Sequence, residues 1–315
     1  MKKILTISIA AYNAEKTIGA TLDTLVRAKY IDYLEILVIN DGSKDNTKDV
    51  VEGYVRRYPN SVNLINKPNG GYGSTINISS AEANGKYYKL LDADDWFDTD
   101  NLDKLIEDLK IHDEDMIFNQ YVVRHESGKP DVLKEQKYLY NKTCSAEDVS
   151  GFCMHALTIK SELIRSNMRI TEKCYYTDVE FFIKCVLRSR TFISLPYYVY
   201  IYRLGREGQS VSVESMIAHS KEHELITKKA LAIMYKTKRN KRLRVSIENL
   251  ARDHAQMLLS KQPTKDNWDE YYNFCRYIKV KYPKIKITVY CKLAYISYFW
   301  LYRPLCLAQR KKLGL

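Results

Sequence analysis

The chain lacks a long uninterrupted apolar run. None of its stretches reaches the roughly 18 apolar residues that a membrane-spanning helix needs, so no ordinary transmembrane span is expected. The apolar residues that follow Met1-Lys2-Lys3 imitate a short secretory signal, but residues 12–16 continue into a helical pattern. A first buried strand therefore explains residues 4–11 better than a leader peptide does.

Cysteine pairing is also missing. The chain holds seven Cys, which is an odd count, and none of them forms a C-x-x-C pair. This usage is typical of reduced thiols in a cytosolic protein, because disulfide frameworks and zinc sites need paired spacings. We therefore expect a cytoplasmic protein in which several of the cysteines belong to the core.

Acidic residues are absent from the end of the chain. Glu270 is the last of them, whereas basic residues continue to Lys312, and the formal net charge is +12. Such an end favours a polyanionic partner: a membrane surface, a nucleic acid or a phosphorylated acceptor. The 26 Tyr favour interfaces, carbohydrate stacking or a membrane boundary.

The first hundred residues contain a regular alternation of short apolar runs and amphipathic segments. Strands that alternate with helices predict βαβ units with right-handed crossovers. The expected fold is α/β, with a doubly wound, mostly parallel sheet whose ligands bind beyond the carboxyl ends of the strands. The predicted strands are residues 4–11, 35–39, 62–65 and 86–91.

Polar clusters follow three of these strands, at residues 11–13, 41–43 and 92–95. The last cluster places Asp92, Asp94 and Asp95 within four positions. Like charges this close repel one another, and burying them without partners costs several kcal/mol. A divalent cation, Mn²⁺ or Mg²⁺, would relieve the repulsion and leave coordination positions for phosphate oxygens. The alternative is a solvated acidic turn that caps the following helix.

Four segments, taken in order, resemble the signature of family 2 glycosyltransferases. They are Ser8-Ile-Ala-Ala-Tyr-Asn13, Val38-Ile-Asn-Asp-Gly-Ser-Lys-Asp-Asn-Thr47, Asn69-Gly-Gly71 and Leu91-Asp-Ala-Asp-Asp95. The resemblance implies an inverting, metal-dependent enzyme of the GT-A fold that uses a nucleotide-diphosphate sugar, of the type that builds bacterial cell-surface polysaccharide. Two departures occur: Ala10 stands where many members have Pro, and Asn40 replaces the first Asp of the usual Asp-Asp-Gly-Ser.

The resemblance gives the clusters chemical roles. Asp41 resembles the carboxylate that accepts the uracil N3–H, which favours a UDP donor, although a helix-capping turn is the other interpretation of residues 41–43. Asp92 resembles the residue that contacts the ribose and the donor sugar, and the implied metal ligands are Asp94, the principal one, with Asp92 and Asp95. The implied donor site comprises Ala11, Tyr12, Asn13, Asp41, Asn69, Gly71, Gly73, Asp92, Arg203, Arg206 and Ser210.

Residues 171–182 resemble the family's Glu-Asp pair at the start of a helix, with Thr177 in the Glu position. Asp178 is then the predicted general base, which takes the proton of the acceptor hydroxyl during an in-line displacement at the anomeric carbon. The alternative is that Thr177 and Asp178 only cap the helix.

Residues 200–212 resemble a segment that closes over the donor in bacterial relatives. Arg203 or Arg206 would neutralise the diphosphate there, since a guanidinium binds phosphate through a fork of two hydrogen bonds. A plain surface loop is the alternative.

We expect residues 1–213 to form the GT-A catalytic domain. Within it, residues 1–115 would be the nucleotide-sugar-binding half, and residues 116–213 the acceptor half with its lid. A helical region is expected over residues 214–315.

His155 is expected to be packed and not catalytic. His219 and His223 are expected on a solvated helix face, because Lys221, Glu222 and Glu224 lie between and beside them.

Residues 285–312 mix aromatic and basic side chains, which suits a membrane interface with anionic lipids; a final core helix is the alternative.

The predicted function is transfer of a hexose or N-acetylhexosamine from a UDP-sugar to a cell-surface glycan, carried on undecaprenyl diphosphate at the inner face of the plasma membrane. A polyol-phosphate (teichoic acid-like) or protein acceptor is an alternative. A nucleic-acid-binding protein or a non-enzymatic scaffold is disfavoured, because the acidic cluster would repel phosphate and Asp41, Asp92, Asp94 and Asp178 are all present.

Overall fold

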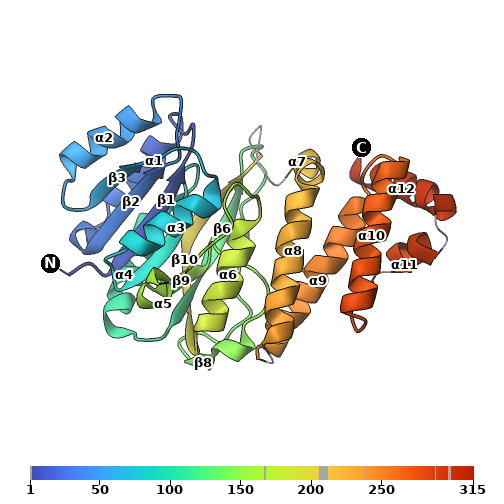
Figure 1. The fold of residues 1–315 in the computed structure, drawn as a ribbon. Coiled ribbons are helices and arrows are strands. Elements are labelled where there is room, and N and C mark those ends of the chain that lie inside the picture. The colour runs from blue at the N-terminus through green and yellow to red at the C-terminus, as the bar shows by residue number, and fades with distance from the viewer. Residues whose placement is uncertain (1, 167, 206–211, 238, 288, 297–298) are drawn as a thin grey trace. The chain divides into compact units, whose positions relative to one another are not determined.

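One mixed sheet organises the first part of the chain, as the computed structural model in Figure 1 shows. The structure describes residues 2–166, 168–205, 212–237, 239–287, 289–296 and 299–315. The contacts between residues divide the chain into two compact units, Met1–Arg206 and Glu207–Leu315.

The first half of the sheet is parallel. The strands run in the order β3-β2-β1-β4; β1, β2 and β4 are largely apolar and buried on both faces, as expected where helices cover both sides, whereas the edge strand β3 is only partly buried. The predicted α/β fold is confirmed, with strand ends within one residue or so of those expected. The elements are β1 (Leu5–Ala11), α1 (Ile18–Val26), β2 (Leu34–Asn40), α2 (Thr47–Arg57), β3 (Val62–Asn66), α3 (Tyr72–Glu82) and β4 (Tyr87–Asp92), with a 3₁₀ turn at Ile31–Tyr33.

The second half of the sheet changes direction at β4, whose partner β9 runs antiparallel to it. The order continues β4-β9-β6-β10-β5, and β10 pairs in parallel with β6 through a register shift around Pro196, which has no N–H to donate to the ladder. The elements are β5 (Trp96–Phe97), α4 (Thr99–Ile111), β6 (Met116–His125), β7 (Val132–Lys134), β8 (Cys144–Ser145), a 3₁₀ turn (Ala146–Asp148), β9 (Leu157–Lys160), α5 (Glu162–Arg165), α6 (Thr177–Arg188) and β10 (Thr191–Leu204).

Helices cover both faces of this sheet. Apolar side chains of α1, α2 and α4 form one core cluster with the face that includes Tyr87. The next residue, Tyr88, points to the other face, where its hydroxyl lies 2.7 Å from Ser79 Oγ of α3 and its ring lies 6.1 Å from that of Phe181 of α6. Figure 1 shows α3 and α6 on that same side. β4 lies between the layer of α1, α2 and α4 and the layer of α3 and α6. Its last residue, Asp92, therefore lies at an edge of the sheet that both layers border.

The second unit is helical, as the sequence predicted from residue 214 onward. An apolar stripe along α8 packs on α9, with Ile226, Leu231 and Ile247 buried. His223 lies on that stripe and is 7% exposed, so the prediction of a solvated face was wrong for this residue. The helices are α7 (Val213–Ala218), α8 (Ser220–Lys236), α9 (Lys241–Leu258), α10 (Lys265–Lys281), α11 (Val289–Ile296) and α12 (Phe299–Leu313).

The final helix, α12, has two different faces. Tyr302 and Cys306 are fully buried, whereas Trp300 is 88% exposed and Leu307 is 51% exposed. The helix therefore contributes to the core of the unit and also presents apolar side chains outward. Among the described residues, no helix combines the length and the apolar character that crossing a membrane requires.

Candidate active site

The predicted polar clusters meet at one edge of the sheet. Ala11 of β1 is in register with Asn40 of β2, and Ala10 is in register with Asp92 of β4. The N–H of Asp41 donates to the carbonyl of Ala11 over 2.8 Å, which ties two of the clusters together directly. This convergence follows from the parallel strand order, because carboxyl ends of neighbouring parallel strands lie at a common edge.

The Asp41 carboxylate is buried and organises the glycine-rich loop after β3. It accepts hydrogen bonds from the backbone N–H groups of Gly70 (2.9 Å) and Gly71 (2.8 Å) and forms an ion pair with Lys67. It does not cap α2, whose N-cap residue is Asn46. The capping alternative is therefore wrong for Asp41, and the carboxylate faces the loop that follows the next strand.

The cluster after β1 is fixed by reciprocal hydrogen bonds to the turn after β2. Asn13 has a left-handed backbone, with φ of 50°; its N–H donates to Ser43 Oγ (3.0 Å) and its side-chain oxygen accepts from the N–H of Lys44 (2.8 Å). Ala11 is buried, whereas Tyr12 is half exposed. The geometry leaves the Tyr12 ring at the surface of the candidate donor site.

The glycines after β3 make room for another part of the chain. An ideal Cβ at Gly73 would lie 1.9 Å from the carbonyl oxygen of Thr171, and one at Gly71 would lie 3.2 Å from the N–H nitrogen of Lys173. Gly71 also has a φ of +77°, which L-residues with side chains rarely adopt. Asn69, in the same loop, is exposed. The space beside Gly71 and Gly73 is thus filled by backbone atoms of residues 171–173.

A possible metal-binding group forms beyond β4. One carboxylate oxygen each from Asp92 and Asp95 and one ring nitrogen of His155 all lie within 4.8 Å of one another. Two carboxylates and an imidazole match the ligand types that divalent transition metals accept. Two of the three predicted ligands are thus brought together, whereas Asp94 does not belong to this group.

Asp95 is held firmly within the group. It is 1% exposed; Tyr200 Oη donates to its Oδ2 (2.7 Å) and the N–H of Arg203 donates to its Oδ1 (2.8 Å). Burial, together with the nearby charge of Asp92, raises the pKa of Asp95 to about 7. A cation bound at this position would oppose the rise in the pKa of Asp95 and favour the ionised carboxylate.

His155 comes from the turn before β9, the antiparallel neighbour of β4. Its ring is packed, as the sequence predicted, but its place beside Asp92 and Asp95 was not predicted. Its ring stacks on Tyr202, with centroids 4.5 Å apart, and meets Tyr200 edge-on at 4.6 Å. The buried Lys89 donates to the carbonyl of His155 over 2.8 Å. Burial and the charge of Lys89 lower the pKa of His155 to about 3, so the imidazole is neutral and keeps a lone pair for a ligand.

Asp178 is the second residue of α6 and faces the same region. The N-cap residue of α6 is Tyr176, so neither Thr177 nor Asp178 occupies the capping position. Burial raises the pKa of Asp178, while backbone N–H groups of the first turn oppose that shift. Burial is the largest cause of the raised pKa of Tyr72, and the negative charges of Asp92 and Asp178 raise it further. The predicted metal ligand and the predicted base therefore both act on one tyrosine.

The predicted lid residues lie partly outside the described structure. The guanidinium of Arg203 lies 5.2 Å from the centroid of the Trp96 ring, and its Nη1 lies 3.6 Å from Glu126 Oε1. Arg206 and Ser210 are outside the described residues. Tyr72, Tyr200 and Tyr202 border the predicted site residues but had no role assigned from the sequence; the signal for the last two was their place in the segment 200–212.

Comparison with known proteins supports the resemblance. A glycosyltransferase MG025 homolog of Mycoplasma pneumoniae is 39% identical over 99 residues, which is 30% of this chain and 33% of that protein. The putative glycosyltransferase EpsH of Bacillus subtilis is 26% identical over 213 residues, 64% of this chain and 61% of that protein. The alignments thus span about one third and three fifths of these relatives.

Solved structures share the fold. S. aureus TarS 1-349, solved in complex with UDP-GlcNAc, has a TM-score of 0.71 at 16% identity over 98% of this chain and 92% of that one. A mannosyltransferase from Pyrobaculum calidifontis, solved with GDP-Man and Mn²⁺, has a TM-score of 0.58 at 15% identity over 100% and 85%. The family model described as "Glycosyl transferase family 2" matches residues 6–165, more than half of the chain. Together with the β1–β4 edge described above, this match shows that the chain belongs to glycosyl transferase family 2.

Proposed function

We propose that the protein is an inverting enzyme that moves a sugar from a UDP-sugar to a hydroxyl of a cell-surface glycan, and that residues 1–213 form its catalytic domain. The observation that carries the proposal is the group formed by the ligand atoms of Asp92, Asp95 and His155, which all lie within 4.8 Å of one another. A possible cation site and a further carboxylate, Asp178, whose charge acts on the same tyrosine as that of Asp92, would be the two charged groups that an in-line displacement needs.

Asp178 would act as the general base. Its raised pKa, caused by burial, makes it a better proton acceptor than a solvated aspartate. As it takes the proton of the acceptor hydroxyl, the hydroxyl oxygen bonds to the anomeric carbon, and the bond from that carbon to UDP breaks on the opposite face. UDP leaves with the bonding electron pair, so the configuration at the carbon inverts.

Asp92, Asp95 and His155 would hold a divalent cation, Mn²⁺ or Mg²⁺, and their ligand atoms are close enough to share one. When bound, such a cation supplies positive charge that offsets the charge of the departing diphosphate. Asp94, which the resemblance assigns as the principal ligand, stays a fourth candidate. Comparison of Mn²⁺ affinity in Asp94→Asn and His155→Asn discriminates between the two assignments.

Asp41 would select uracil. The Oδ1 atom of Asp41 accepts from the N–H of Gly70, from Lys67 and, over 3.5 Å, from Ser74 Oγ, whereas the bond printed to Oδ2 comes from the N–H of Gly71. Because a carboxylate oxygen has about two acceptor positions, Oδ2 would accept the N3–H of a uracil ring at its second one. TarS, which shares the fold, was solved with UDP-GlcNAc, and this supports a uridine nucleotide as the first donor to test.

The acceptor would be carried on a lipid at the inner face of the plasma membrane, with undecaprenyl diphosphate as the proposed carrier. The support is α12, where Trp300 and Leu307 are exposed on a helix that ends in Arg310, Lys311 and Lys312. Apolar and basic side chains on one helix suit an anionic membrane surface. A polyol-phosphate or protein acceptor is the second candidate, because the same basic residues would attract an anionic polymer.

Calorimetric titration of UDP and of GDP into the full chain, with and without Mn²⁺, tests the donor proposal. We expect saturable UDP binding that requires Mn²⁺, and weaker GDP binding. The GDP arm is included because the P. calidifontis mannosyltransferase was solved with GDP-Man. Binding of GDP in preference to UDP, or no binding by folded protein, would contradict the proposal.

A further inference from the structure

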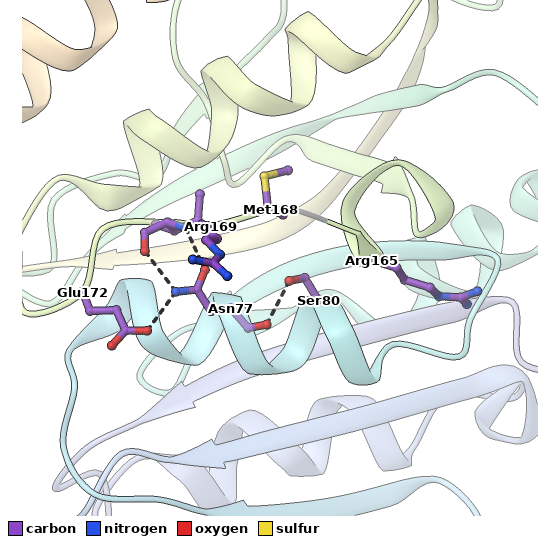
Figure 2. Close-up of a pocket in the computed structure, with 7 residues that line it drawn as sticks. Asn77, Ser80, Arg165, Met168, Arg169 and Glu172 are labelled. Carbon is purple, nitrogen blue, oxygen red and sulfur yellow. Dashed lines mark hydrogen bonds between the residues drawn. The ribbon is translucent and has the colours of Figure 1, made fainter.

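The segment that leads to Asp178 is clamped against α3 by one side chain, Asn77. Its amide oxygen accepts from the N–H of Ile170 over 2.7 Å, and its amide nitrogen donates to the carbonyl of Ile170 over 3.0 Å. The nitrogen also donates to Glu172 Oε1 over 3.0 Å. Asn77 thus pairs with Ile170 as a neighbouring strand would, and Figure 2 shows its amide pointing at this segment.

The clamp is next to a tight backbone contact. One residue further along, the carbonyl of Thr171 occupies the space that a side chain on Gly73 would need. The N–H of Lys173 then donates to the carbonyl of Gly70 over 2.7 Å. Residues 170–173 therefore lie along α3 and the loop before it, which is the loop that Asp41 organises.

The other side of the segment is bonded to α6. Glu180 is 5% exposed, and its Oε2 accepts from both the N–H (3.0 Å) and the hydroxyl (2.6 Å) of Thr171. Its Oε1 pairs with Lys184 over 2.7 Å. Burial raises the pKa of Glu180, but hydrogen bonds from Lys184 and Thr171 outweigh that effect and lower it, so the side chain is a carboxylate. Asp178 lies two residues earlier on the same helix.

We infer that Asn77 and Glu180 are positioning residues that fix Asp178 relative to the donor site. They act through residues 170–173, which connect α3 to the first turn of α6. Because a displacement of about 1 Å at a reacting group can lower the rate about a hundredfold, a base carried on a helix start needs such support. The inference rests on the proposed role of Asp178. The inference further states that residues 170–173 hold both the loop around Asp41 and the start of α6, which carries the proposed general base.

Two pairs of variants test the inference. Asn77→Ala removes the clamp, and Ser80→Ala is its matched control, since Ser80 lies one turn later on α3 and lines the same pocket of about 560 Å³. The Ser80 hydroxyl donates to the backbone carbonyl of Asn77 over 3.2 Å and makes no bond to residues 170–173 among those the structure gives. Glu180→Ala removes the bonds to Thr171, whereas Glu180→Gln keeps an oxygen that can accept both.

The measurements are UDP release without acceptor, from whichever of UDP-glucose, UDP-galactose and their N-acetylated forms wild type hydrolyses fastest, and UDP affinity by calorimetry with Mn²⁺. We expect Asn77→Ala and Glu180→Ala to lower kcat by about tenfold or more while KM and UDP affinity change by less than about threefold. Ser80→Ala and Glu180→Gln should stay within about threefold of wild type in all of these values.

Three outcomes overturn the inference. If wild type hydrolyses a UDP-sugar and Asn77→Ala matches Ser80→Ala, the clamp does not position the base. If Asn77→Ala loses UDP affinity as strongly as kcat, Asn77 supports the whole loop and not Asp178. If wild type neither binds UDP nor releases it from any of the four sugars, the proposed function fails, and the inference fails with it.

Discussion

Acid should destabilise the helical unit through two buried histidines, His223 of α8 and His254 of α9. Their Nδ1 atoms are 3.0 Å apart, and their rings are stacked with centroids separated by 5.0 Å. Thr227 Oγ1 lies 3.3 Å from the His223 ring, and Phe274 packs edge-on against His254. Burial lowers the pKa of His223 to about 4 and that of His254 well below its usual value, where the charge of His223 adds to the effect.

The sign of the effect follows from the direction of these shifts. In the unfolded chain both groups titrate near 6.5, so the unfolded state binds more protons than the folded state as the pH falls below that value. Stability is fully present above about pH 6.5 and is lost toward about pH 4. Each histidine contributes a slope of about 1.4 kcal/mol per pH unit, so the pair contributes about 3 kcal/mol per unit. That is a large fraction of the roughly 5–15 kcal/mol of a typical domain.

Urea denaturation between about pH 7.5 and pH 5, followed by tryptophan fluorescence and circular dichroism, measures this slope. Trp268, which is 4% exposed in α10, reports on the helical unit. We expect the His223→Gln/His254→Gln variant to lose most of the slope. His219→Gln, a change at a histidine beside Glu222 at the start of α8, should keep it. A double variant with the slope of wild type would refute the reasoning, because the carboxylates of the chain would then account for all of the acid sensitivity.

Three further predictions concern the site and the last helix. Gly73→Ala should lower the free energy of unfolding by about 1–3 kcal/mol in urea titrations, because its Cβ would lie 1.9 Å from a carbonyl oxygen. Gly53→Ala, on α2 with nothing within 4 Å of the new Cβ, should raise it by up to about 1 kcal/mol; the same sign for both would be contrary to this argument. Asp178→Asn should stop UDP release while UDP affinity stays within about threefold of wild type, and normal turnover would reassign the base. Trp300→Ser should reduce co-sedimentation with anionic liposomes, whereas Ile111→Ser, at another exposed apolar position, should not; equal loss from both would count against α12.

The parallel half of the sheet was predictable because its signals are local. β1, β2 and β4 are short, mostly apolar runs that helices cover on both faces, and each is followed by a polar turn within the next few residues. Once those strands were assigned, parallel order alone brought the three polar clusters to one edge. The acidic cluster after β4 and the start of α6 at Thr177 were readable for the same reason.

The positions of His155 and Lys89 could not be predicted, because they depend on pairing between strands that are distant in the sequence. His155 reaches the acidic cluster because β9 pairs with β4, and the sequence between them gives no register. Lys89 looks like a strand-interrupting charge, yet its amine is fully buried and bonded to the carbonyls of His155 and Leu157. His223 is a different kind of miss. Its charged neighbours suggested solvent, but it lies on the stripe of Ile226 and Ala230, so helical spacing was the better guide.

The bond between Asn77 and Ile170 spans 93 positions, and this separation has a consequence for the order of folding. The four parallel strands can form from the first hundred residues, since all of their pairings with one another lie within that part of the chain. The loop around Gly70 and Gly73 cannot take its final shape until Thr171 and Lys173 have docked on it. Contacts this distant in sequence form late, because loop closure has an entropic cost that only later contacts offset. A chain that is stalled or cleaved before residue 170 would therefore carry its donor residues in a sheet but leave the loop that surrounds Asp41 unfinished.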